Sequence, residues 1–319
     1  MENKLVSLRE TADFLRANDD FLIIAHKSPD GDTIGCSLSL YYGLTQMGKR
    51  AKILCSDEFP EKYSYIYEPY KSSVKDFLEK TVITVDLADT QLFGSITEKY
   101  SDKVELCIDH HPSNTFYAKR TFLNAKAAAC CENIFEILSF LNVSFDKNIC
   151  NSLYTGIVTD SGCFKFSNTT SKTHIIAAHL IDMGADYARI NKALADTKTR
   201  ARLSIEKEVI NSLEYYFEDR CAVVTITDQM INSSGATEGE MEGLASLPRE
   251  IEGVEVGITL KQKNNGYKIS LRTGEAVDAS LICQELGGGG HARAAGCFIE
   301  GDSQSAKEIL LEKIKPYLS

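Results

Sequence analysis

Three features are missing from this chain of 319 residues, and each absence excludes a class of protein. No apolar run approaches the roughly 20 residues that a membrane-spanning helix needs, so a membrane protein is not expected. The amino-terminal segment is amphipathic and of mixed charge, unlike a secretory signal or a transit peptide, which predicts a cytoplasmic location. An excess of basic residues is also missing, because the net charge is −10. Long duplex DNA or long RNA is therefore not expected as a ligand, since proteins that grip it usually carry a basic face.

The ten cysteines include no CxxC pair, which argues against a zinc site. Most of them lie in apolar patterns, where reduced cysteine behaves as a small hydrophobic residue. We therefore expect free thiols. Cys163 is distinguished by its closeness to Asp160, an acid that follows an apolar run.

The first half of the sequence alternates between strand and helix patterns. Apolar, β-rich runs predict strands at 21–26, 51–55, 81–89 and 103–111. Helical patterns cover 7–17, 33–48, 127–142, 146–160 and 171–184, and a hairpin is expected at 162–170. Strands separated by helices in this way predict an α/β fold with a mainly parallel sheet flanked by helices.

The second half predicts a smaller α/β unit. Residues 191–216 are polar and helical in pattern and predict a connecting helix. After it come a strand at 221–227, two strands around the "NNG" turn at 264–266, a glycine-rich stretch and a helix from Ser303. The chain is therefore expected to divide into 1–190, a connecting helix at 191–217, and 218–319.

Four segments of the first half place acids or histidines at the carboxyl end of an apolar run. Taken singly, each such acid is more commonly a helix cap or a turn residue. In open α/β sheets, however, the loops at the carboxyl ends of strands line one crevice, so four segments together predict one site. The residues are His26, Asp30 and Asp32; Asp86; Asp109, His110 and His111; and Asp160.

Carboxylates and imidazoles packed together repel one another unless cations neutralise them. An oxygen-rich set with one or two imidazoles suits Mn²⁺ or Mg²⁺ better than Zn²⁺. The set is large enough for two metal ions about 3.5–4 Å apart, as in phosphatases and nucleases, where the metals activate a water that attacks phosphorus. Asp86 stands alone on its strand and suits the shared bridge.

The motifs "HKSPDGD", "VDLAD", "DHH" and "TDSG", with "GGGGHARAAG" near the carboxyl end, resemble the DHH/DHHA1 phosphoesterase superfamily over nearly the whole chain. The length and the stretch "EGLASLPREIEGVEVGITL" resemble its bacterial nanoRNase/pAp phosphatase (NrnA-like) branch. The resemblance implies an N-terminal DHH catalytic domain, a connecting helix and a smaller C-terminal DHHA1 substrate-binding domain. It also implies an active site in the cleft between the domains.

The resemblance implies a role for each site residue. One manganese ion would be held by His26, Asp30, Asp86 and Asp160. The second would be held by Asp32, Asp86, His110 and Asp160, and Mg²⁺ or Co²⁺ would substitute for Mn²⁺. His111 would lie beside the scissile phosphate, with Asp109 orienting the histidines from behind. Cys36, in a small-residue position, and Ser161, where threonine is commoner, are the departures, and neither removes a ligand.

The glycine-rich stretch has two interpretations. A four-glycine run by itself is commonly a flexible turn. Glycines also let backbone N–H groups approach a phosphate, and Arg293 adds a cation nearby. The resemblance implies that this loop and one arginine grip the far phosphate or base of the substrate, through Arg272, Gly288, Gly289, Gly290 and His291.

The activity implied is Mn²⁺-dependent hydrolysis of short oligoribonucleotides (nanoRNA) to 5′-mononucleotides and of adenosine 3′,5′-bisphosphate (pAp) to AMP. A phosphodiesterase acting on cyclic di-AMP or its linear product pApA is the alternative. A RecJ-type exonuclease needs additional strand-binding domains and a basic channel, and a family II pyrophosphatase has a different C-terminal domain. A non-enzymatic nucleotide sensor would be expected to have lost some of the metal-ligating residues, whereas every expected ligand is present in this sequence. The resemblance is compatible with a homodimer.

Overall fold

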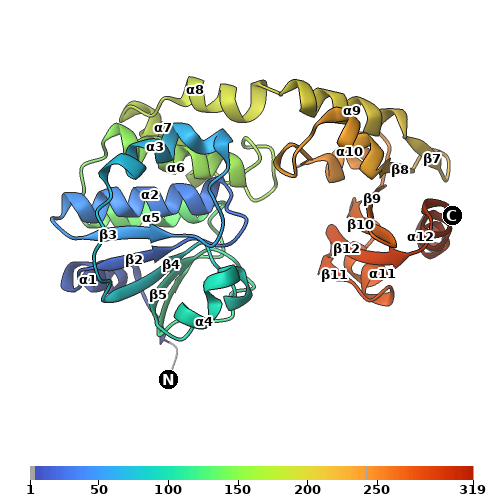
Figure 1. Ribbon diagram of the computed structural model, residues 1–319. Coiled ribbons are helices and arrows are strands. Elements are labelled where there is room, and N and C mark those ends of the chain that lie inside the picture. Colours follow the sequence, from blue (N-terminus) through green and yellow to red (C-terminus); the bar gives the residue numbers. More distant parts are fainter. Residues whose placement is uncertain (1–3, 242, 319) are drawn as a thin grey trace. The chain divides into compact units, whose positions relative to one another are not determined.

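The computed structural model describes residues 4–241 and 243–318 (Figure 1). The chain divides into two compact units, with the boundary between Thr197 and Lys198. We call them unit 1 and unit 2. None of the helices among the described residues is both long and apolar enough to cross a bilayer. All ten cysteines are free thiols, as predicted, and eight of them are buried.

Unit 1 is built on a six-stranded sheet. Its strands are β1 (Lys4–Leu5), β2 (Phe21–Ile24), β3 (Ala51–Leu54), β4 (Thr81–Val85), β5 (Val104–Asp109) and β6 (Arg120–Leu123). They lie in the order β1-β6-β5-β4-β2-β3, and every neighbouring pair is parallel. The predicted parallel sheet is confirmed. The short strands β1, at one edge, and β6, next to it, were not predicted, because strands of two and four residues show no recognisable period.

Helices cover both faces of this sheet, as predicted (Figure 1). The helical elements are α1 (Leu8–Ala17), α2 (Gly31–Gln46), η1 (Glu61–Tyr63), α3 (Ser64–Ser73), η2 (Thr90–Ile96), α4 (Thr97–Tyr100), α5 (Cys130–Phe140), α6 (Lys147–Asp160), α7 (Ser171–Asp182), α8 (Tyr187–Asn191) and η3 (Lys192–Asp196). One sheet face, with Ile23 and Ile83, packs on α1, α2 and α5. The other, with Leu22 and Val82, packs on η2 and α4. Burial on both faces explains why these strands are apolar without alternation.

Two glycines let α2 and α6 pack closely. A Cβ atom built on Gly35 would contact the backbone oxygen of Ser152 in α6 and would lie 3.0 Å from Cys131 Sγ. A Cβ atom on Gly156 would lie 2.7 Å from Oδ1 of Asp32 and 3.1 Å from its Cα atom. The close crossing therefore fixes the amino-terminal turn of α2 against the carboxyl-terminal half of α6.

Unit 2 contains a second six-stranded sheet. Its strands are β7 (Glu214–Tyr216), β8 (Cys221–Ile226), β9 (Val256–Lys263), β10 (Gly266–Thr273), β11 (Gly289–His291) and β12 (Ala294–Glu300). Its helical elements are α9 (Arg200–Asn211), α10 (Asp228–Ser234), η4 (Gly239–Met241), η5 (Leu244–Glu250), α11 (Ala279–Glu285) and α12 (Ser303–Leu318). The order is β11-β12-β10-β9-β8-β7, and β8–β9 is the parallel pair. The hairpin predicted around "NNG" is confirmed as β9–β10.

Two local predictions were wrong. Residues 162–170 form a series of turns rather than a hairpin, and Gly162, Cys163 and Phe164 all have positive φ angles that a strand ladder does not accept.

The stretch 191–216 is not one continuous helix. It is interrupted after η3, where Thr197 is extended, and Thr199 caps a new helix by accepting a hydrogen bond from the backbone N–H of Arg202.

The glycine crossing yields a prediction about stability. Gly35→Ala should lower the free energy of unfolding by about 1–3 kcal/mol, because overpacking against the backbone of α6 exceeds the gain of about 1 kcal/mol in helix propensity. Urea unfolding followed by far-UV circular dichroism measures the change. Gly239→Ala is the matched control, since no heavy atom lies within 4 Å of a Cβ built there. Equal unfolding midpoints for the two variants would contradict the close packing.

Candidate metal centre

Three loops at the carboxyl edge of the unit 1 sheet carry predicted ligands. His26 lies just after β2, and the same loop supplies Asp30, whose side chain caps α2, and Asp32 in the first turn of that helix. Asp86 follows β4 directly. Asp109 is the last residue of β5, with His110 and His111 immediately after it. The sheet therefore brings these segments together as the sequence predicted.

Asp160 reaches the same place from a helix and not from a strand. It is the last residue of α6. The helix predicted at 146–160 is confirmed, and its buried carboxyl-terminal part is the apolar run that precedes Asp160.

The imidazole nitrogens of two histidines face two groups of carboxylates. Nε2 of His26 lies 3.7 Å from Asp30 Oδ1 and 3.8 Å from Asp86 Oδ2. Nε2 of His110 lies 3.4 Å from Asp86 Oδ1, 3.3 Å from Asp160 Oδ2 and 3.9 Å from Asp32 Oδ2. Asp86 is common to both groups, and its two oxygens face different histidines.

Backbone carbonyls determine which nitrogen each histidine presents. Nδ1 of His26 lies 2.7 Å from the carbonyl oxygen of Lys27, and Nδ1 of His110 lies 3.1 Å from that of Ala127. A carbonyl oxygen only accepts, so Nδ1 is the donor in both rings. In each neutral ring Nε2 is therefore the atom with a free lone pair for a metal.

Asp32 is held by the amino terminus of α5. Its carboxylate accepts hydrogen bonds from the backbone N–H groups of Cys130, at 2.5 Å, and Cys131, at 3.0 Å. Ala129, at the cap position of α5, offers no side chain for this purpose, so Asp32 supplies the missing cap from another helix. The thiol of Cys36 also lies 3.6 Å from Asp32 Oδ1. Burial raises the pKa of this thiol well above its usual range, so it remains a donor. The sequence did not reveal these contacts.

Asp109 lies behind the adjacent histidines. It is fully buried and accepts hydrogen bonds from His111 Nδ1, at 2.8 Å, and from Asn114 Nδ2, at 2.6 Å. Burial would raise its pKa, but these donors outweigh burial and lower it, so the group stays ionised. The His111 side chain is 41% exposed and turns Nε2 away from Asp109. Asn114 is a further buried member of the group that the sequence did not predict.

The buried carboxylates shift one another's protonation. Burial and the charge of Asp32 raise the pKa of Asp86 well above its usual range and raise that of Asp160 to about 8. Burial alone would lower the pKa of His110, but Asp86, Asp32 and Asp160 outweigh it and raise the value to about 10. Without other cations, protons must therefore balance this negative charge.

The residues fit divalent cations. Three ligand atoms lie within 4.8 Å of one another in each of two groups, His26–Asp30–Asp86 and Asp32–His110–Asp160. Oxygen-rich sets with one imidazole each suit Mn²⁺ or Mg²⁺. Asp86 Oδ1 is buried and accepts no hydrogen bond among the described residues, which leaves a lone pair directed into the site. Asp86 also has a φ angle of 55°, an uncommon conformation that aspartate tolerates.

Apart from His111, the residues predicted to bind substrate lie in unit 2. Gly289, Gly290 and His291 form β11, so the glycine run is partly an ordered strand and not only a flexible turn. Gly288 is required by close approach, since a Cβ there would lie 2.5 Å from Cys297 Cβ. Arg272 is on β10, directly opposite Ala294, which in turn is opposite His291. The register thus places Arg272 and His291 in one row across the sheet.

Arg293, the cation in "HARAAG", is bonded to the backbone of unit 2. Its Nη1 donates hydrogen bonds to the carbonyl oxygens of Gly274, at 2.6 Å, and Val277, at 3.0 Å. The guanidinium group therefore holds the turn after β10 in place.

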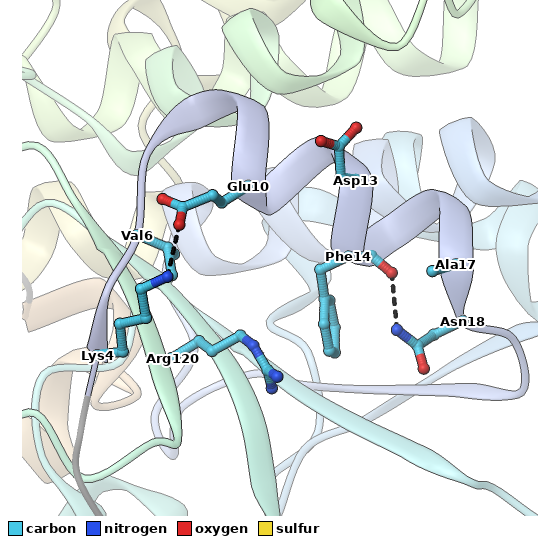
Figure 2. Close-up of a pocket in the computed structure, with 8 residues that line it drawn as sticks. All are labelled: Lys4, Val6, Glu10, Asp13, Phe14, Ala17, Asn18 and Arg120. Carbon is cyan, nitrogen blue, oxygen red and sulfur yellow. Dashed lines mark hydrogen bonds and ion pairs between the residues drawn. The ribbon is translucent and has the colours of Figure 1, made fainter.

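A hollow of about 390 Å³ lies elsewhere in unit 1 (Figure 2). It is lined by Lys4, Val6, Glu10, Asp13, Phe14, Ala17, Asn18 and Arg120. Lys4 pairs with Glu10 at 2.6 Å, and the Arg120 guanidinium lies 5.1 Å from the centre of the Phe14 ring. None of the predicted site residues takes part, so the candidate centre is identified by its chemistry and not by the hollow.

Comparisons with known proteins agree with this organisation. Residues 20–157 match the model of the DHH family N-terminal domain, and residues 219–319 match that of the DHHA1 domain. The bifunctional oligoribonuclease and PAP phosphatase NrnA of Thermus thermophilus is 29% identical, covering 98% of this chain and 94% of that protein. The protein of the same name from Bacillus subtilis is 23% identical, covering 88% and 90%.

Solved structures share the fold. An exopolyphosphatase-related protein from Bacteroides fragilis superposes with a TM-score of 0.86 at 22% identity, covering 98% of this chain and 97% of that one. An exonuclease RecJ bound to manganese superposes with a TM-score of 0.54 at 14% identity, covering 98% and 94%. The two domain matches, in the order that the motifs predicted and over most of the chain, show that the protein belongs to the DHH/DHHA1 phosphoesterase superfamily.

Proposed function

We propose that this phosphoester hydrolase holds two divalent cations, with Mn²⁺ as the preferred metal, and cleaves short oligoribonucleotides and pAp. The observation that carries the proposal is the position of Asp86. One of its oxygens faces His26 and the other faces His110, so a single carboxylate is shared by two groups of ligands. A carboxylate with one oxygen toward each group suits a two-metal site, in which the ions lie about 3.5–4 Å apart.

We assign the first cation to His26, Asp30, Asp86 and Asp160, and the second to Asp32, Asp86, His110 and Asp160. When bound, these cations would supply Lewis acidity toward the phosphoryl oxygens and would lower the pKa of water at the site. The RecJ structure similar to this chain contains manganese, which supports the choice of metal. The oxygen-rich donor set supports it independently.

The chain's own residues orient the site and handle protons. The carbonyls of Lys27 and Ala127 fix the tautomers of His26 and His110. The ionised Asp109 accepts a hydrogen bond from Nδ1 of His111 and so fixes the orientation of the ring. In this orientation Nε2 of His111 is the nitrogen left to contact a phosphate oxygen or the oxygen of the leaving group.

The substrates follow from the names of the relatives and from charge. NrnA proteins at 21–29% identity are named for oligoribonucleotides and pAp. The net charge of −10 disfavours long nucleic acids but permits short anionic substrates bound by local cations. In unit 2 we assign the row of Arg272 and His291, with Gly288, Gly289 and Gly290, to the phosphate or base of the substrate far from the cleaved bond.

A substrate panel tests the proposal. The full chain is incubated with Mn²⁺ and, separately, with pAp, a 5-mer RNA, pApA, cyclic di-AMP and pyrophosphate. Release of AMP from pAp and of mononucleotides from the 5-mer is expected. If pApA or cyclic di-AMP is cleaved faster than both pAp and the 5-mer RNA, the phosphodiesterase alternative is favoured. No release of AMP or mononucleotide from any of them would reject the proposal.

Asp86→Asn should reduce turnover of pAp and of 5-mer RNA by more than about a hundredfold. Loss of an outer-shell partner of a metal ligand typically costs 10–100-fold, and here the shared ligand itself loses its charge. Initial rates at saturating Mn²⁺ measure the effect. Asp182→Asn, at the exposed end of α7, is the control that removes an equal charge elsewhere. A wild-type rate for Asp86→Asn would reject the shared-carboxylate assignment.

Mn²⁺ should stabilise the chelator-treated protein against heat. It neutralises the carboxylates of the site, whose negative charge only protons balance when no other cation is present. Binding to the folded state alone contributes about 2.7 kcal/mol per site when free Mn²⁺ is 100 times Kd. Differential scanning fluorimetry with and without Mn²⁺ measures the rise in Tm. The rise should shrink in Asp86→Asn and persist in Asp182→Asn. An equal rise in both variants would place the stabilising metal elsewhere.

Arg272→Gln should raise KM for pAp by about tenfold or more, since a hydrogen bond to a charged group contributes about 1.5–3 kcal/mol. The guanidinium is partly buried, and this burial lowers its pKa. Steady-state kinetics measures KM and kcat separately. Arg200→Gln removes an exposed arginine from the start of α9 and should leave both values unchanged. An unchanged KM in Arg272→Gln would remove this residue from the substrate site.

A further inference from the structure

One part of the unit 2 sheet is open to solvent along β10 and β12. Its opposite face is covered by α11 and α12, which pack on apolar residues such as Ile269, Leu271 and Ile299. On the open face a shallow hollow of about 590 Å³ is lined by Lys263, Asn264, Lys268, Gly296, Cys297 and Phe298. Neither the predicted metal ligands nor the predicted substrate row includes these residues.

The strand register places this hollow on the same face as the Arg272 row. Lys268 lies directly opposite Phe298, and Arg272 lies directly opposite Ala294. Directly opposed residues of antiparallel strands project from the same face, and residues four apart on one strand also share a face. The Lys268–Phe298 row and the Arg272–His291 row are therefore parallel rows on one surface. At about 3.3 Å per residue, they are separated by roughly 13 Å along β10.

The side chains of this face combine an exposed aromatic ring with surplus positive charge. Phe298 is 44% exposed, and Gly296, two residues earlier on the same face, leaves the space beside the ring free of a side chain. Lys268 is exposed and has no acidic partner among the described residues. Lys261 and Lys263 share one partner, Glu238, at 2.6 and 3.2 Å.

The charge balance of these strands favours an anion. The described residues of β9, β10 and β12 that project from this face include four cations, Lys261, Lys263, Lys268 and Arg272, and one carboxylate, Glu300. Glu238, outside these strands, pairs with Lys261 and Lys263. In a chain with a net charge of −10, this is a local reversal of sign. An aromatic platform next to cations is the combination with which proteins bind single-stranded nucleic acid, because every base has a face that stacks.

We propose that the Lys268–Phe298 row is an accessory subsite for a single-stranded oligoribonucleotide. One base stacks on Phe298, and a neighbouring phosphate contacts Lys268. The inference rests on the proposed function, in which the Arg272 row binds substrate. A mononucleotide such as pAp engages one row, whereas a longer strand reaches across the separation and engages both. The second row thus adds affinity for RNA of several nucleotides without contributing to pAp binding.

Equilibrium binding tests the subsite with full-length protein carrying Asp86→Asn, so that substrate is not consumed. Fluorescence anisotropy gives Kd for a labelled 5-mer RNA, and competition gives Kd for pAp, both with Mn²⁺ present. Phe298→Ala should lower the ratio of 5-mer to pAp affinity by about tenfold, the scale of one base–aromatic stack. Lys268→Gln should reduce the slope of log K against log salt for the 5-mer by about 0.7, the value for one phosphate on a single strand.

Two matched controls lie on α12, which covers the other face of the sheet. Tyr317→Ala removes an aromatic ring with the same 44% exposure as Phe298, and Lys315→Gln removes an exposed cation. Both should leave the affinity ratio and the salt slope unchanged.

The outcomes separate this inference from the proposed function. If the wild-type chain hydrolyses neither pAp nor RNA, the proposed function fails, while the binding comparison still decides the subsite. An affinity ratio for Phe298→Ala equal to that of Tyr317→Ala overturns the subsite, as does a 5-mer that does not bind the Asp86→Asn protein. A loss of pAp affinity equal to the loss of 5-mer affinity also overturns it, because the row would then serve both ligands.

Discussion

The concentration of negative charge at the carboxyl edge of the unit 1 sheet is the constraint on which the rest of the site depends. Asp32 and Asp86 are almost completely buried, and Asp160 is close by. Burial and the charge of Asp32 raise the pKa values of Asp86 and Asp160, and the carboxylates raise the pKa of His110 to about 10. Such a group persists in a fold only with compensating positive charge. The residues of the site therefore fit divalent cations, and the surrounding structure keeps its charges together.

Several backbone features hold these negatively charged side chains in place. The amino terminus of α5 directs two N–H groups at Asp32, so a helix dipole stabilises one of the carboxylates. The close crossing of α2 and α6 through Gly35 and Gly156 fixes the starting turn of one helix against the other. Asp86 adopts a positive φ angle immediately after β4, which directs its oxygens toward two different histidines. Strain of this kind is common at functional sites, where the surrounding packing maintains it.

The sheet of unit 2 has two different faces. One face packs on α11 and α12, and part of the other stays open and cationic. The antiparallel register determines which side chains share the open face, so it places Lys268 beside Phe298 and puts Arg272 in one row with His291. Although the chain is acidic overall, these cations share one surface, as the proposed binding of short anionic strands requires.

Much of the fold and of the candidate site could be predicted from the sequence. The parallel sheet was predictable because strands buried on both faces are continuous apolar runs, and the site was predictable because acids and histidines follow those runs. The short strands β1 and β6, the turns at 162–170 and the break at Thr197 were not, since their conformations depend on local hydrogen bonds and φ angles that leave no periodic signal.

By itself, then, the sequence determined the types of ligand and the order of the elements that carry them, because motif and hydrophobic period are local properties. Only the tertiary structure decided that α5 caps Asp32 and that Arg293 holds a turn, because each depends on contacts between distant segments.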